Sequence, residues 1–582
     1  MKNDTTDRSA FYAKPEFWVV LIALAIAINS QFAALVSKYV INGDVLQSLY
    51  WMQQFRDHEL FTNDLLTEYA KHYHAPWGFL LLYRTLSIAI DPLAISKTLP
   101  IILFVITSVY VFKLVQRFTN TYTGLLCTSL FMVVPIFLGA MVGGHPRAFG
   151  FPFLIIFLYY LIGREHVKAC LLLVLQALFY PMIFFLGALT YVFSSVTVRQ
   201  YRFSLELSRA KVICFLLAVV VSVATLSAKY VFNDSTAIGT TVTRSQMLNQ
   251  PEFAEGGRAP DLLDIPAFPN AVLALSKNNV LAIIKQYPTS VRRVNKQILN
   301  ISTVPTLIVI LLLGVISVVI TGVVKREITI PKEIWYLLLA SAIMYKIADV
   351  MFFRLYQPSR YILYVTPFTN ILFVSIGVGY VLTRLKNPRI QTTLKIAVLF
   401  LVLLHGGLNK GIGLRDYSSY YYHQSGITNN KFAISKELYD YLHSLPKDTV
   451  LAAQPYLADN IPTFAQRKVL VNSELSHPWF DTYWHTLKER TTDFFTAYYA
   501  TDAQSIHEFC EKYGIEYVVV DKRHFTAAYL EEGKIYFEPF NTAIKELVRN
   551  RQDFALLHVS EADKLFVDGE VFVIRRDALK NV

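Results

Sequence analysis

Residues 38–76 read KYVINGDVLQSLYWMQQFRDHELFTNDLLTEYAKHYHAP, a long polar segment that directly follows an apolar run at residues 17–37. The apolar run, FWVVLIALAIAINSQFAALVS, is long enough to cross a bilayer as one helix. In the polar segment, helix-start signals at Asp44 and at Asp64 each precede apolar residues at helical spacing. We therefore expect two amphipathic helices that lie on a membrane surface and form a structured loop.

The overall composition places the chain among polytopic membrane proteins. Of 582 residues, 54% are hydrophobic and only 17% are charged, and the mean hydropathy is +0.38. The net charge of +12 is expected from Lys and Arg in cytoplasmic loops. We favour this explanation over nucleic-acid binding and expect no nucleic-acid partner. The four cysteines are scattered, so neither a disulfide framework nor a zinc-binding spacing is visible.

Apolar runs and the distribution of Lys and Arg predict about eleven transmembrane helices. The segment at 76–93 is apolar but short and contains Arg84, so we interpret it as a surface helix, with a true span as the alternative. The run at 169–198 is too long for one span, and we divide it at Pro181. The expected spans are 17–37, 98–116, 122–141, 149–163, the two halves of 169–198, 212–230, 303–323, 334–353, 361–383 and 395–408.

This topology predicts a polytopic α-helical membrane protein with a C-terminal extracytoplasmic α/β domain. The tail changes character, because short β-type runs such as IEYVVVD (515–521) alternate with helical patterns. The expected units are an N-terminal transmembrane module (1–230) with a first outer loop (38–96), a large outer loop (231–302), C-terminal transmembrane helices (303–409) and the soluble domain (410–582).

Asp44 is the candidate catalytic group of the first outer loop. It follows Asn42-Gly43 at a point where a carboxylate would be held just outside the bilayer. The alternative is structural: Asp44 would cap a helix, with Gln47 completing a capping box. A cap position does not exclude chemistry, because it holds the carboxylate rigidly.

Two other outer turns contain basic residues that suit a phosphate. The turn MVGGHPRAFGF (141–151) exposes His145 and Arg147, and the turn DVMFFRLYQPSRYILYVTPF (349–368) contains Arg354, Arg360 and Tyr361. Arginine on the outer face runs against the positive-inside tendency, so these residues predict an anionic partner; lipid headgroups are the alternative. The arginines and Asp44 together predict an anion-binding cleft.

The remaining candidates are less specific. Arg258, in the Gly256-Gly257-Arg258 stretch of the large loop, could close over a substrate or belong to an ordinary connection. Asp64, His72 and His74 could contact a substrate from the first loop. Two histidines without a spaced acidic cluster do not predict a metal site, so we expect no cofactor, with a divalent metal as the alternative.

The plan of a first outer loop with an acidic residue, a seven-span module, a second large loop and an outward soluble domain resembles the GT-C superfamily of membrane glycosyltransferases. That superfamily includes protein O-mannosyltransferases, aminoarabinose transferases and oligosaccharyltransferases. Gly43-Asp44 matches the position of the family's first-loop acid, which acts as a catalytic base or as an acceptor- or metal-binding carboxylate. Where oligosaccharyltransferases have an acidic pair in the next outer turn, this chain has His145-Pro146-Arg147, which is similar to metal-independent members.

The resemblance implies transfer of a sugar from a polyprenyl-phosphate donor to an extracytoplasmic glycan, lipid or protein acceptor at the plasma (inner) membrane. It implies Asp44 as the base, with Arg354, Arg360 and Arg147 on the donor phosphate. The alternative function is a transporter or flippase of a lipid-linked saccharide, for which Lys346 and Asp349 inside a predicted span are the supporting residues.

Overall fold

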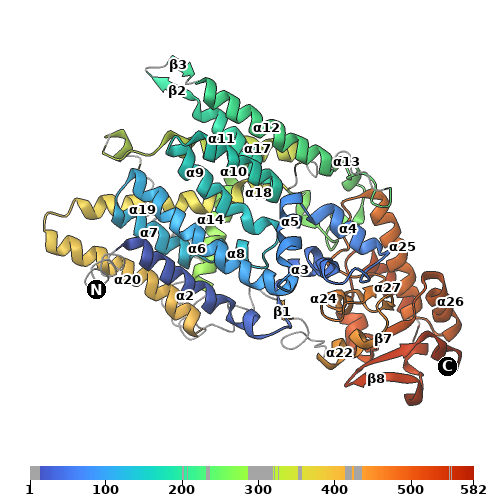
Figure 1. Cartoon of the computed structure of the whole chain (residues 1–582). Helices are drawn as coiled ribbons and strands as arrows, with labels where there is room; N and C mark the ends of the chain where they lie inside the picture. The colour runs from blue at the N-terminus through green and yellow to red at the C-terminus, as the bar shows by residue number, and fades with distance from the viewer. Residues whose placement is uncertain are drawn as a thin grey trace, which may run out of the picture.

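The computed structural model describes residues 14–199, 202–205, 208–230, 236–285, 319, 322–325, 327–351, 355, 357–412, 423–424, 436–549, 551 and 553–581. The chain forms a helical region and a smaller α/β domain at one end of it (Figure 1). We call this the domain end of the helical region.

Long apolar helices form the helical region. Five described segments are long and apolar enough to cross a bilayer, and a sixth would be α7 (Thr121–Val133) with α8 (Pro135–Met141), which meet at a 62° bend. The bend coincides with Pro135, whose ring cannot continue the preceding helix. The five segments are α2 (Pro15–Val36), α6 (Pro92–Phe118), α12 (Arg209–Tyr230), α17 (Lys332–Met351) and α18 (Ser359–Leu363) with α19 (Thr366–Thr383).

Shorter apolar helices lie among these: α9 (Gly150–Ile162), α10 (His166–Phe179) and α11 (Pro181–Ser194). The expected division at Pro181 is confirmed, since α10 ends and α11 begins there. The segment at 76–93 contains α5 (Trp77–Leu86), whose ten residues extend only about 15 Å, too little to cross a bilayer. Helix α20 (Pro388–Ile412) covers the expected span at 395–408, and the expected span at 303–323 lies almost entirely outside the described residues.

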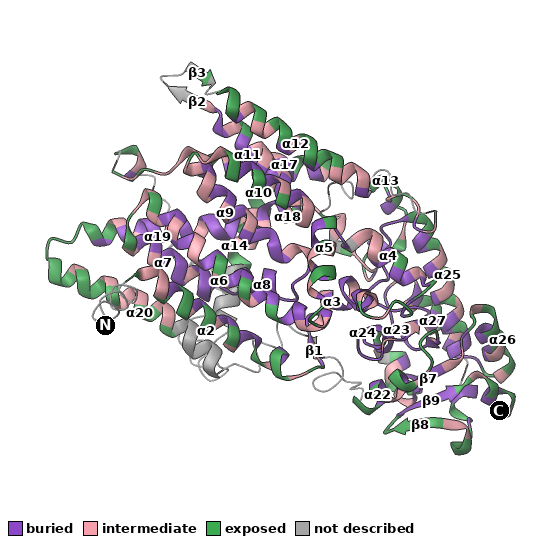
Figure 2. Cartoon of the chain, viewed as in Figure 1, coloured by how far each residue is buried: buried purple, intermediate pink, exposed green. Residues whose placement is uncertain are grey.

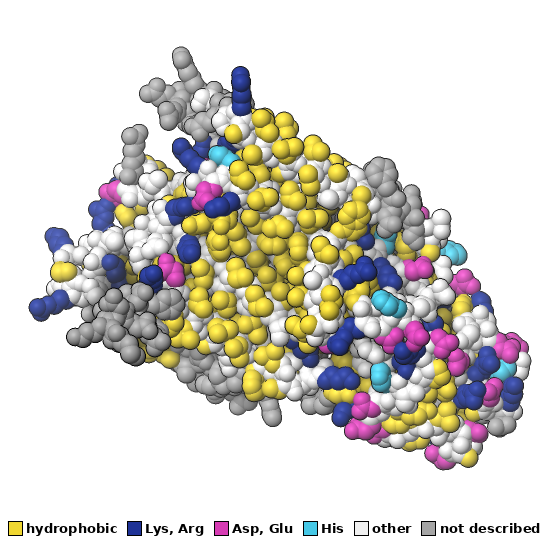
Figure 3. Space-filling model, in the orientation of Figure 1, with side chains coloured by type: hydrophobic (Ala, Val, Ile, Leu, Met, Phe, Trp, Pro, Cys, Tyr) yellow, Lys and Arg dark blue, Asp and Glu magenta, His cyan; other side chains and the backbone are white. Residues whose placement is uncertain are grey.

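Side-chain burial agrees with a bilayer around the helical region. Buried residues line the interior of the helix cluster, whereas the outward faces are exposed (Figure 2). In the space-filling view the outward face is an apolar belt, and Lys and Arg lie beyond it both at the end opposite the domain and on the side of the domain (Figure 3). Exposed apolar side chains in such a belt are stable in contact with lipid.

The first loop forms the helices that the sequence predicts. It contains β1 (Val40–Ile41), α3 (Gly43–Ser48), the 3-10 helix η1 (Tyr50–Phe55) and α4 (Leu65–His74). Strand β1 pairs with β4 (His423–Gln424) from the segment after α20. Lys97 of α6 holds the start of the loop, because its Nζ donates to the carbonyl oxygens of Ser37 (2.7 Å) and Lys38 (3.3 Å) at the end of α2.

The C-terminal domain is built on a five-stranded sheet in the order β6-β5-β7-β9-β8. The pairs β5–β6 and β5–β7 are parallel, and β7–β9 and β8–β9 are antiparallel. The strands are β5 (Val450–Ala452), β6 (Lys468–Val469), β7 (Tyr517–Asp521), β8 (Lys564–Asp568) and β9 (Val571–Arg575). The domain's longer helices are α22 (Lys436–Ser444), α25 (Asp481–Tyr498), α26 (Ala503–Tyr513) and α27 (Phe540–Val548). The predicted α/β class is confirmed, and β7 lies within the β-type run predicted at 515–521.

The region at 231–302 differs from the polar outer loop that we expected. Its first half contains α13 (Arg244–Met247), η3 (Pro251–Phe253) and η4 (Pro260–Leu262), and its second half contains the 18-residue helix α14 (Phe268–Lys285). Helix α14 packs among the transmembrane helices: Ser276 Oγ accepts a hydrogen bond from Asn370 Nδ2 of α19 (2.9 Å). Ser276 of this helix thus has a partner inside the helical region, which the sequence pattern does not reveal.

Candidate functional site

Asp44 lies in the first turn of α3, but it is not the cap of that helix. Asn42 is the N-cap, and its side-chain oxygen accepts a hydrogen bond from the Asp44 N–H (3.0 Å). Gln47 does not complete a capping box, because its side chain hydrogen-bonds to the Glu474 carboxylate of the C-terminal domain. The capping interpretation of Asp44 is therefore wrong, and its carboxylate is available for other partners.

The turn with paired glycines approaches α3 closely. Gly143 and Gly144 have φ angles of +88° and +58°, a region that side chains with a Cβ rarely adopt. A Cβ on Gly143 would lie 3.0 Å from the Asn42 Cβ. The Tyr83 hydroxyl donates to the Gly144 carbonyl (2.9 Å) and holds the turn from α5. The glycines thus allow the next residues, His145 to Arg147, to reach Asp44.

Replacing Gly143 by Ala tests this close approach. The left-handed conformation and the contact with Asn42 are expected to reduce the free energy of unfolding by about 1–3 kcal/mol. Thermal unfolding of the purified variant measures the change. Gly569→Ala is the matched control, because Gly569 also has positive φ (+58°) but has open space around it; a smaller loss at Gly143 than at Gly569 would contradict the packing argument.

Asp44, His145 and Arg147 form a compact ionic cluster. Asp44 Oδ2 lies 2.7 Å from an Arg147 terminal nitrogen and 3.1 Å from His145 Nε2. The His145 side chain is almost fully buried, whereas the Asp44 side chain is 39% exposed. The carboxylate therefore faces an accessible space on one side and two nitrogen groups on the other.

The charges around Asp44 keep it ionised. Burial by itself would raise the pKa of this carboxyl, but the Arg147 charge, the His145 contact and the Arg360 charge together lower the pKa well below its usual value. Burial and the Arg147 charge lower the pKa of His145, against the opposing effect of Asp44. At neutral pH the cluster thus combines an anionic Asp44 and a cationic Arg147 with a neutral imidazole.

The second predicted turn reaches the same site from α18. The Arg360 charge is one of the influences that lower the pKa of Asp44. Tyr361 is fully buried and its hydroxyl donates to the Leu355 carbonyl (2.9 Å), so this hydroxyl is engaged within the turn. Tyr364, which the sequence did not single out, donates to the Arg147 carbonyl (3.3 Å) and packs over Gly150. Arg354 lies outside the described residues.

The other predicted candidates are engaged elsewhere. Arg258 Nε and a terminal nitrogen donate to the carbonyls of Ser476 (3.1 Å) and Ser473 (3.3 Å) in the C-terminal domain. Asp64 is the N-cap of α4, accepting from the Thr67 N–H (2.9 Å), and burial raises its pKa. His72 lies edge-on to Phe480, and His74 is the last residue of α4.

The C-terminal domain completes one side of the site through the loop after β6. Asp459 accepts from the N–H groups of Ser473 (2.7 Å) and Glu474 (2.8 Å), which fixes the shape of this loop. Glu474 reaches Gln47, one turn along α3 from Asp44. Sequence reasoning missed Glu474 because no local signal marks a contact across more than 400 residues.

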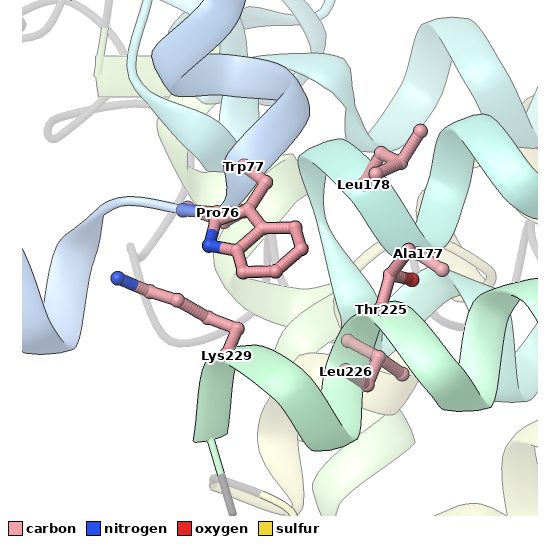
Figure 4. Close-up of a pocket in the computed structure, with 7 residues that line it drawn as sticks. All are labelled: Pro76, Trp77, Ala177, Leu178, Thr225, Leu226 and Lys229. Atoms are coloured by element: carbon pink, nitrogen blue, oxygen red, sulfur yellow. The ribbon is translucent and has the colours of Figure 1, made fainter. Parts of the chain in front are cut away.

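A shallow pocket lies away from this cluster, where α5, α10 and α12 meet (Figure 4). Of its lining residues only Lys229 is ionisable, and its Nζ points away from the apolar walls and donates to the Lys71 carbonyl (3.0 Å). An apolar pocket of this kind does not supply acid–base chemistry. The lining residues are Pro76, Trp77, Ala177, Leu178, Thr225, Leu226 and Lys229.

Comparison with solved structures finds oligosaccharyltransferases of Archaeoglobus fulgidus. The apo form matches with a TM-score of 0.50 at 14% identity, covering 89% of this chain and 71% of that chain. The chain has the fold of this oligosaccharyltransferase. A complex with an inhibitory peptide and a dolichol-phosphate has a TM-score of 0.48 at 13% identity, covering 89% and 71%. A complex with Zn and sulfate has a TM-score of 0.47 at 15% identity, covering 91% and 70%. No protein-family model and no curated protein matches the chain.

The partners of Asp44 bear on whether this carboxylate could hold a divalent metal. Here Asp44 faces a guanidinium and an imidazole, and a guanidinium already supplies the positive charge that a metal would bring. Within the described part of the chain, no three His, Cys, Asp or Glu side chains lie close enough to hold a metal ion. The expectation of no divalent metal at Asp44 stays a prediction.

Asp349, the residue that supported a transporter, lies near the end of α17. It pairs with Arg244 of α13 (3.0 Å) and with Lys346 (3.1 Å). The segment that contains Arg244 contacts the C-terminal domain, because the Val242 N–H donates to the Trp479 carbonyl (3.0 Å). The ion pair thus lies at the domain end and not in the middle of a span.

Proposed function

We propose that the protein is an integral-membrane glycosyltransferase that moves a sugar from a polyprenyl-phosphate donor to an extracytoplasmic acceptor. The observation that carries this proposal is the cluster in which Asp44 lies against His145 and Arg147 within reach of the Arg360 charge. A carboxylate beside arginines supplies both a base and an anion site, which are the two groups that transfer from a sugar phosphate needs. The GT-C fold is the architecture expected for this reaction.

In the proposed reaction Asp44 takes the proton of the acceptor hydroxyl or amide. The acceptor atom then attacks the anomeric carbon of the sugar, and the bond from that carbon to the phosphate oxygen breaks. The polyprenyl phosphate leaves with the bonding electron pair, and Arg147 and Arg360 stabilise its added negative charge. No nucleotide is consumed, because the sugar–phosphate bond is already activated.

The distribution of cations supports an extracytoplasmic site. A group of Lys and Arg lies at the end of the helical region opposite the domain (Figure 3). They include residues at the α6–α7, α9–α10 and α19–α20 connections, where the positive-inside rule places cytoplasmic loops. The cluster and the C-terminal domain then face the other side. The residues are Arg117, Arg164, Lys168, Arg384, Lys386 and Arg389.

The experiment that tests this function is transfer of a labelled sugar from polyprenyl-phosphate donors by the full chain in membrane vesicles. Arg360→Ala is expected to lower the transfer rate about 100-fold, because the leaving phosphate loses a cationic partner. Arg84→Ala, which removes an exposed arginine of α5, is the matched control and is expected to keep the rate. Absence of transfer by the unaltered protein from every polyprenyl-phosphate sugar would contradict the function.

A further inference from the structure

Arg147 contacts the proposed base, Asp44, and also belongs to the proposed phosphate site. We propose that Asp44 and the donor phosphate compete for the Arg147 guanidinium, so that donor binding draws Arg147 away and frees Asp44 to act as the base. This exchange rests on the proposed function, since it assumes a phosphate-bearing donor at this cluster. It assigns to Arg147 a second role beyond holding the phosphate.

The contacts of Arg147 suit such an exchange. One terminal nitrogen pairs with Asp44 at 2.7 Å, whereas its buried Nε has no hydrogen-bond partner within the described part of the chain. A buried donor without a partner is unfavourable, so the guanidinium gains a hydrogen bond by moving onto an anion that can accept from both nitrogens. A phosphate group presents several oxygens in the geometry that a guanidinium fork matches.

The backbone of Arg147 can stay in place while its side chain moves. The residue lies in η2 (Pro146–Phe149), directly before α9, and its carbonyl accepts from the Tyr364 hydroxyl (3.3 Å). The side chain is 29% exposed, so it borders the accessible space beside Asp44. Only side-chain torsions therefore need to change when an anion arrives.

The exchange resolves a chemical difficulty in the unliganded cluster. A carboxylate that is tightly paired with Arg147 is a weak base, because its proton-bound form is disfavoured. When Arg147 turns to the phosphate, the neighbours that still face Asp44 are His145 of the same turn, Arg360 of α18 and, through Gln47, Glu474 of the C-terminal domain. Asp44 then becomes a stronger base at the moment when the substrate is in place.

The test measures binding without turnover. The full chain in lipid nanodiscs is titrated with a short-chain polyprenyl phosphate, which lacks the sugar and cannot react. If Asp44 competes for Arg147, Asp44→Asn is expected to bind this ligand about tenfold more tightly than the unaltered protein, the size expected for one charge-assisted hydrogen bond. In an Arg147→Gln background, Asp44→Asn is expected to change the affinity less than about twofold.

The controls separate competition from a general charge effect. Asp57→Asn removes a carboxylate of the same loop whose partner is Lys447 of the C-terminal domain (2.7 Å), and it is expected to leave the affinity within about twofold. Unchanged or weaker binding by Asp44→Asn, no binding by either protein, or the same gain in the Arg147→Gln background would overturn the exchange. If Arg147→Gln does not fold, Arg147→Met takes its place. Binding that follows the expected pattern without any transfer would refute the proposed function but not the exchange.

Discussion

Asp44→Asn is expected to lower the turnover number for sugar transfer by about 1000-fold, the range that removal of a general base produces. Asparagine keeps the size of the side chain and can still accept a hydrogen bond, but it cannot take a proton from the acceptor. The backbone of α3 should not change, because Asn42 and not Asp44 caps the helix. The loss is therefore expected to be chemical, with the fold retained.

Transfer of a labelled sugar from the polyprenyl-phosphate donor in membrane vesicles measures this loss, with thermal unfolding as the check on folding. Asp57→Asn is the matched control. Asp57 lies in the same loop as Asp44, but its carboxylate pairs with Lys447 of the C-terminal domain (2.7 Å). It is expected to keep most of the activity, since surface ion pairs contribute little. A folded Asp44→Asn protein with full activity would exclude Asp44 as the base.

Tyr69→Ala is expected to reduce the free energy of unfolding by about 3–5 kcal/mol, the cost of removing a large aromatic side chain from a packed interior. Tyr69 of α4 is fully buried at the contact between the first loop and the C-terminal domain. Its ring stacks on Tyr483 with a centroid separation of 3.9 Å, and its hydroxyl lies 3.1 Å from His477 Nδ1. The change should therefore weaken the attachment of the domain as well as the loop.

Denaturation followed by intrinsic fluorescence gives the stability, and limited proteolysis reports whether the domain separates from the first loop. Tyr69→Phe keeps the stacked ring and removes only the hydroxyl, so it is expected to cost about 1 kcal/mol. Equal losses for the two variants would show that the hydroxyl contact with His477, and not the aromatic stack, holds the interface.

Local patterns were sufficient for most of the elements. Apolar run length predicted α2, α6 and α12, and Pro181 predicted the break between α10 and α11. The alternation of strands and helices predicted the class of the C-terminal domain. The helix α14 was not predicted, because polar residues such as Ser276, which is paired with Asn370 of α19, resemble a surface loop when read without their partners.

The candidate site was predictable only in its parts. The sequence singled out Asp44, His145, Arg147 and Arg360 from three separated segments, and the structure brings them together. In the structure Arg258, by contrast, donates to the backbone carbonyls of Ser473 and Ser476 in the C-terminal domain. No sequence pattern near Arg258 indicates these acceptors.

The sequence by itself determined that residues 38–76 would form surface helices beside a membrane, because apolar length and helix-start signals act over a few residues. Only the tertiary structure decided what Asp44 does in that segment. Asn42 is the N-cap of α3, and the paired glycines let an Arg147 nitrogen lie 2.7 Å from Asp44 Oδ2. Glu474 of the C-terminal domain hydrogen-bonds to Gln47. Ionic contacts depend on distance in space, and the distance between residues 44, 147 and 474 is a property of the packed fold alone.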